Sequence, residues 1–134
     1  MNILLLGDAR FGTAFDRSYA RHDNWVITHI ANFEPDTFED ISAQKEVIDA
    51  IESTEYDLII SPPFSRCQMH VEVAKFYRNI KSKYHISIYI LDILFPSIGT
   101  HEVELNNRDG FTYITDFSTN YFENCIELPL LGVL

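Results

Sequence analysis

The feature that most constrains the fold is the opening segment MNILLLGDARFG, in which an apolar run stops at a glycine. Residues Asn2–Leu6 contain three consecutive leucines and no charged residue, which is typical of a strand buried on both faces. Gly7 and Asp8 follow directly, and aromatic side chains then recur at helical spacing over residues 11–21. A buried strand that ends at glycine and leads into a helix is the first unit of an open α/β sheet.

Four further segments are predicted as strands because they are rich in apolar, β-branched and aromatic residues: 25–31, 56–61, 86–91 and 111–114. Apolar periodicity predicts helices over 11–21, over 42–53 and from residue 65 onward, with Ser65 and Gln68 as a capping box, and a last helix over 121–128. Strands that alternate with helices indicate a parallel sheet. The sequence therefore predicts one three-layer α/β domain over residues 1–134, Rossmann- or flavodoxin-like, with a mainly parallel five-stranded sheet and helices on both faces.

Length and composition limit the class of protein. A chain of 134 residues with 46% hydrophobic residues can form one packed core. No apolar run approaches the roughly 18–20 residues that span a bilayer, and the first residues do not have the pattern of a signal peptide, so we expect a cytoplasmic protein with no membrane partner. Cys67 and Cys125 are expected to be free thiols. The five histidines lack metal-ligand spacing, which predicts no metal site, and His29 is expected in the core.

The formal net charge of -10 is unevenly distributed along the chain. Nine acidic residues and one lysine lie between Glu34 and Asp57, whereas five basic residues and one glutamate lie between Arg66 and Lys83. A nucleic-acid backbone would be repelled, so nucleic acid is not expected as a partner. The acidic segment would attract a basic protein surface, or it is a solvated helix that only aids solubility. The apolar tail 128–134 is a second candidate surface, through which the chain could form a homo-oligomer.

Parallel strands bring their carboxyl ends to one edge of the sheet, and a ligand should bind in the crevice there. The candidate ligand-binding residues at this edge are Gly7, Asp8, Arg10, Gly12, Ser61 and Asp92. The turn from Gly7 to Gly12 could hold an anion with backbone N–H groups, although it has neither G-x-G-x-x-G nor the Gly-Lys-Ser/Thr of a P-loop; the alternative is a plain glycine turn. The Gly-Asp-Ser block of serine esterases is broken at Ala9, and no catalytic residue is predicted.

Strand order and spacing resemble those of a response-regulator receiver domain over nearly the whole chain. The segment YDLII (56–60) resembles that family's third strand, and GFTYITDF (110–117) resembles its last-strand segment, Gly-Ala-x-x-Tyr-hydrophobic-x-Lys-Pro-Phe. The resemblance implies an acidic pair after the first strand, a phosphoacceptor aspartate at the end of the third, a Thr or Ser on the fourth and a lysine after the last.

This chain departs from the receiver pattern at each of those positions. They hold Gly7-Asp8, then Ser61 or Pro62, then Leu91 or Asp92, and finally Asp116-Phe117. A phosphoryl group would lack its acceptor, its magnesium ligands and its lysine. The resemblance therefore implies a pseudo-receiver that acts by binding.

Two functional hypotheses remain, and neither names a cofactor. The first is a non-catalytic binding or regulatory module with a protein partner, for which a basic surface is favoured. The second is a small-molecule or nucleotide-binding protein that uses the crevice beside Gly7. Its enzymatic form would be a degenerate formyltransferase, because His101-x-Val103 and Asp109-Gly110 resemble that family, although Ser87-Ile88-Tyr89 stands where its Asn-x-His is expected.

Overall fold

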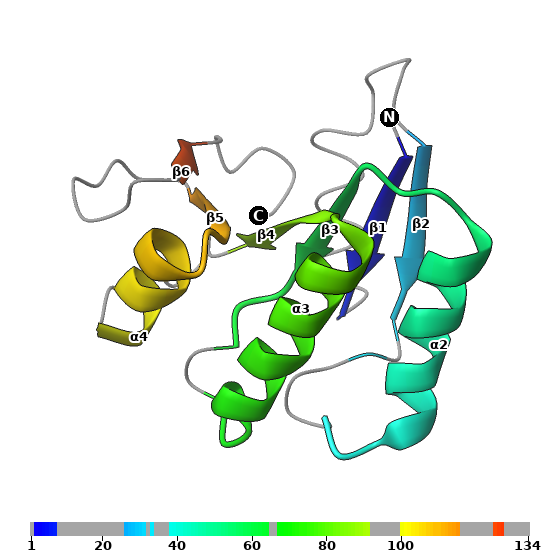
Figure 1. Cartoon of the computed structure of the whole chain (residues 1–134), viewed down its shortest axis with the longest axis horizontal. Coiled ribbons are helices and arrows are strands. Elements are labelled where there is room, and N and C mark those ends of the chain that lie inside the picture. The colour runs from blue at the N-terminus through cyan, green and yellow to red at the C-terminus, as the bar shows by residue number, and fades with distance from the viewer. Residues whose placement is uncertain are drawn as a thin grey trace, which may run out of the picture.

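The structure is a computed structural model that describes residues 2–7, 26–31, 33, 38–64, 67–91, 100–115 and 125–127. Its centre is a six-stranded sheet with the spatial order β2-β1-β3-β4-β5-β6 (Figure 1). The strands are β1 (Asn2–Leu6), β2 (Val26–Ile30), β3 (Leu58–Ser61), β4 (Ser87–Leu91), β5 (Thr112–Thr115) and β6 (Cys125–Glu127). Every pairing between neighbours is parallel.

The predicted α/β fold is confirmed, because all five expected strands occur as parallel neighbours. β2 and β3 lie on opposite sides of β1, which is the strand order of flavodoxin-like sheets. The sixth strand was not expected. Residues 125–127 were predicted to be helical, but they extend the sheet by pairing with residues 113–115. That prediction is wrong because periodicity alone cannot distinguish a strand from a helix in so short an apolar run.

β1 lies inside the sheet, and its position explains its composition. The four side chains of Ile3 to Leu6 are 0–2% exposed. A parallel strand covered on both faces has no polar face, so its sequence is a continuous apolar run. β2 is different: its residues alternate little in polarity, and most of its side chains are exposed, including Val26 at 62%.

Helices α2 (Ile41–Ser53) and α3 (His70–Tyr84) lie side by side on one face of the sheet (Figure 1). α2 begins at the side chain of Asp40, whose Oδ1 accepts hydrogen bonds from the backbone N–H groups of Ser42 and Ala43. The Ser42 hydroxyl also donates to Oδ1, over 2.6 Å, and this bond together with the backbone bonds favours the carboxylate and lowers the pKa of Asp40. α2 buries Ala43, Val47 and Ile51, and α3 buries Val73, Ala74, Tyr77 and Ile80, so each helix packs one apolar stripe on the sheet. The predicted helix over 11–21 lies outside the described residues.

α3 begins five residues later than the sequence predicts. The N–H of Cys67 bonds to the carbonyl of Phe64 and that of His70 to the carbonyl of Cys67, so a turn precedes the helix. The N-cap residue, Met69, makes no side-chain capping bond. The predicted capping box is therefore wrong, because Gln68 lies in the turn rather than in the first helical turn. No described helix is long and apolar enough to cross a membrane.

A short helix, α4 (Thr100–Val103), continues into the π-helix η2 (Glu104–Arg108), and neither was predicted from the sequence. η2 is joined to the start of β5 by the fully buried Asn106, whose amide Nδ2 donates to the carbonyl of Phe111 over 2.8 Å. Two side chains of α3 also contact the segment between η2 and β5. Arg78 pairs with Asp109 at 2.6 Å, and Lys81 donates to the carbonyl of Gly110 over 2.7 Å. The entry to β5 is therefore fixed from two sides.

Candidate functional site

The point where the strand order reverses lies between β1 and β3, and this is where the fold class predicts a crevice. Gly7 follows β1 with a φ of 98°, and an added Cβ would lie 2.6 Å from Cγ of Pro62, which follows β3. Both the backbone angle and the close approach therefore require glycine. The structure thus places Gly7 and the end of β3 at one edge, as the sequence predicted.

His29 holds the turn at Gly7 from the neighbouring strand. Its Nε2 lies 2.9 Å from the carbonyl oxygen of Gly7, and the N–H of Gly7 donates to the carbonyl of Ile30 over 3.0 Å. Because a carbonyl only accepts, this ring nitrogen carries the proton. The expectation that His29 lies in the core is wrong: it is an exposed residue of β2, and its ring is held by this one backbone contact.

Ser61 ends β3, and its hydroxyl is already bound within the protein. The residue is fully buried; its Oγ lies 2.6 Å from the hydroxyl of Tyr77 and donates to the carbonyl of Pro62 over 2.8 Å. These bonds fix α3 against the carboxyl end of β3. A ligand-binding role for Gly7 and Ser61 stays a prediction, and the other candidates, Asp8, Arg10, Gly12 and Asp92, lie outside the described residues.

Two histidines meet beside this edge: His101, which the sequence offered only through the formyltransferase resemblance, and His70, which no motif singled out. His70 is the first residue of α3, and His101 lies in α4; their rings are 4.7 Å apart at 69°. His101 also contacts the ring of Phe64, with centroids 6.2 Å apart. The two residues are far apart in sequence and have no motif spacing, so only the tertiary structure brings them together.

The surroundings of His101 favour the neutral form of its ring. Its Nε2 is buried and has no hydrogen-bond partner among the residues that the structure describes. Burial lowers the pKa of His101, and the nearby His70 and Arg78 act in the same direction, against Glu102 and Glu104. Within the described ranges, no group of three His, Cys, Asp or Glu residues is placed to hold a metal ion.

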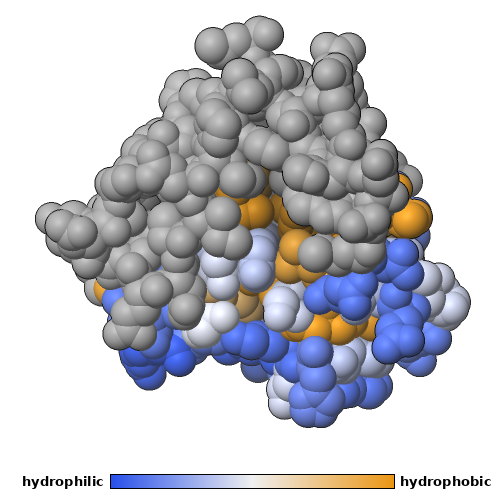
Figure 2. All heavy atoms as spheres, turned by 90° about the horizontal axis from the view of Figure 1, so that it is seen from above, coloured by the Kyte–Doolittle hydropathy of each residue, from blue (hydrophilic) through white to orange (hydrophobic). Residues whose placement is uncertain are grey.

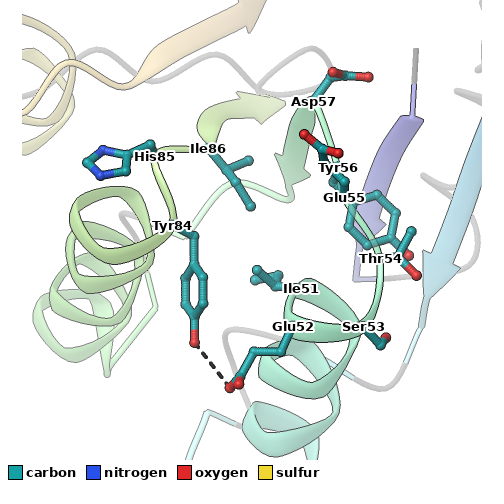
Figure 3. Close-up of a pocket in the computed structure, with 10 residues that line it drawn as sticks. All are labelled: Ile51, Glu52, Ser53, Thr54, Glu55, Tyr56, Asp57, Tyr84, His85 and Ile86. Atoms are coloured by element: carbon teal, nitrogen blue, oxygen red, sulfur yellow. Dashed lines mark hydrogen bonds between the residues drawn. The ribbon is translucent and has the colours of Figure 1, made fainter.

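A hollow of about 480 Å³ lies at the opposite, amino edge of the sheet (Figure 3). It is lined by the end of α2, the segment that enters β3 and the end of α3. Glu52 accepts a hydrogen bond from the hydroxyl of Tyr84 over 3.2 Å, and Asp57 accepts one from the backbone of Asn2 over 2.8 Å. In the view from above, hydrophilic residues form much of the outer rim of the described surface (Figure 2). This hollow is separate from the carboxyl-edge crevice.

Comparisons with known proteins do not assign a family to the chain. No protein-family model, no curated protein and no solved structure matched it. The functional argument therefore depends on the geometry described above.

The close contact of Gly7 with Pro62 predicts a specific loss of stability. Gly7→Ala should lower the free energy of unfolding by more than the ~1–3 kcal/mol expected for a strained backbone angle, because the proline ring cannot move away from a new Cβ. Gly110→Ala is a matched control: its φ of 74° is also positive, but the nearest atom is the flexible Nζ of Lys81. Urea denaturation measures both, and equal losses would contradict the role given to Pro62.

Proposed function

We propose that this chain is a non-catalytic binding or regulatory module with receiver-like topology. The observation that carries the proposal is the end of β3, where the resemblance would place a phosphoacceptor carboxylate. Ser61 is fully buried there with its hydroxyl bonded to Tyr77, and the Pro62 ring lies against Gly7. Neither side chain can form the acyl phosphate that an aspartate forms.

The remaining positions of the receiver pattern support the same proposal. After β1 the sequence offers one acidic residue, Asp8, and the position of the family's lysine is taken by Asp116, which has the opposite charge. Among the described residues, Lys81 is committed elsewhere: its amine donates to the carbonyls of Asp109 and Gly110. An acidic residue in place of the lysine would repel a phosphoryl group rather than stabilise it.

The charge of α2 favours a basic protein as partner. Glu46, Asp49 and Glu52 are exposed on this helix, and Lys45 is already paired with Asp49 at 2.6 Å. Glu55 and Asp57 continue the acidic surface toward β3, and the whole chain has a net charge of -10. Such a surface raises the rate of encounter with a positively charged partner. We place the protein in the cytoplasm; self-association through the tail 128–134, which lies outside the described residues, stays a prediction.

The first test uses a small phosphodonor. The purified chain is incubated with acetyl phosphate and magnesium, and its intact mass is measured. We expect no phosphoryl adduct, because the groups at the end of β3 are buried and bonded. An adduct mapped by peptide mass spectrometry to an aspartate at the carboxyl edge would contradict the proposal.

The second test measures attraction to a basic partner. A lysine- and arginine-rich peptide is the probe, and Glu46→Lys should weaken its binding up to about fivefold, since one exposed charge pair contributes up to ~1 kcal/mol. Glu72→Lys is the matched control, because Glu72 is also exposed and helical but lies on α3. Isothermal titration at low and high salt measures both variants. Equal effects of the two substitutions would contradict a docking role for α2.

A second candidate function is the binding of a nucleotide or another small anion at the Gly7 turn. The observation that favours it is the position of Gly7 at the reversal of strand order, with a positive φ and its backbone at the sheet edge. The formyltransferase form is not favoured, because His101 contacts His70 whereas Asp109 pairs with Arg78.

A thermal-shift series with nucleotides and folates tests this candidate. A ligand at a hundred times its Kd should stabilise the fold by about 2.7 kcal/mol, which raises Tm. Arg10→Ala should abolish that rise if this side chain offsets the charge of Asp8. An unchanged rise in Tm in the variant would remove Arg10 from the site. If no ligand raises Tm, this second candidate is rejected and the binding-module proposal is the one that remains.

A further inference from the structure

Two imidazole rings meet where α4 packs against the start of α3. His70 is oriented by its Nδ1, which lies 3.0 Å from the carbonyl of Cys67. His101 packs against this ring at a centroid distance of 4.7 Å and against Phe64 at 6.2 Å. Both contacts are edge-to-face, so the His101 ring packs in a partly aromatic environment.

A neutral His101 fits this place, and a charged one does not. Nε2 is buried and has no hydrogen-bond partner among the described residues. An unprotonated Nε2 has no N–H to satisfy, so leaving it without a partner costs little. Protonation would place an N–H donor and a positive charge there without an acceptor. The docked position therefore favours the neutral ring over the protonated one.

Among the residues that the structure describes, the charged groups around His101 come from two segments. On α3, His70 and Arg78 oppose a positive charge, although Arg78 is itself paired with Asp109. On the segment of His101 itself, Glu102 and Glu104 favour the charge. Burial is the largest effect and opposes it, so the pKa of His101 lies below its ordinary value of 6.5.

We propose that the His70–His101 contact is a proton-sensitive latch, which holds α4 against the start of α3 near neutral pH and releases it in mild acid. The release is confined to α4 and the start of η2. The far end of η2 has anchors of its own, because Asn106 donates to the carbonyl of Phe111 and Asp109 pairs with Arg78. The inference does not depend on the proposed function.

The sign of the pH dependence follows from linkage. A released His101 has its ordinary affinity for a proton, whereas the docked ring binds a proton less well. Docking is therefore fully stabilised above pH 6.5, the ordinary pKa, and loses stability as the pH falls from there through the lowered pKa. Because Phe64 follows β3 by three residues, release would also loosen one wall of the carboxyl edge.

The test follows the full chain between about pH 5 and about pH 8, the range in which an ordinary histidine titrates. Imidazole NMR signals give the pKa of His101, which should lie below its ordinary value of 6.5. Hydrogen exchange, corrected for the intrinsic rate, should show a several-fold loss of protection over residues 100–104 in acid, with α2 unchanged.

Variants separate this latch from a general effect of acid. His101→Phe keeps an aromatic ring that does not titrate, so protection over 100–104 should become independent of pH; His101→Gln replaces it if the phenyl ring does not fit. His85→Asn, which tolerates the left-handed backbone at that residue, should behave as the parent chain. If the loss of protection in acid persists in the His101 variants, it comes from other groups and the proposal is overturned. An unlowered pKa of His101 would overturn it as well.

Discussion

The parallel pairing of β1 with β3, closed at its carboxyl end by Gly7 against Pro62, is the constraint on which the rest of the structure depends. β1 is covered on both faces, and its register with β3 brings the two chain exits within van der Waals distance. A side chain at Gly7 would force these exits apart. The predicted ligand site lies at the same two exits, so one contact affects both the stability of the fold and that candidate site.

Tyr77 transmits this constraint from the sheet to the helical layer. Its hydroxyl is bonded to Ser61 at the end of β3, and its ring packs against Phe33, Phe64 and Phe111. A single buried residue of α3 therefore contacts the groups that follow β3 and precede β5. The Ser61 hydroxyl, which could have faced a ligand, is used to position the helix.

The two edges of the sheet have different chemistry. The amino edge has a hollow with carboxylates on its rim and continues into the acidic surface of α2. Among the described residues, the carboxyl edge includes the backbone of Gly7, the ring of Pro62 and the edge-to-face pair of His70 and His101. A protein partner drawn by charge and a small ligand held in a crevice would thus use different surfaces, which allows the experiments on each to be interpreted separately.

The sequence by itself determined the α/β class, the parallel direction of the five strands and the place of Gly7. A continuous apolar run such as LLL indicates a strand covered on both faces, and the glycine at its end marks the turn that follows. It did not determine the start of α3, the strand at 125–127, the exposure of His29 or the meeting of His70 with His101. Those features depend on contacts between segments far apart in the chain. The turn at 67–69 delays the start of α3 past the predicted capping residues, and the edge position of β2 exposes His29. The packing of α4 on α3 makes His70 and His101 neighbours.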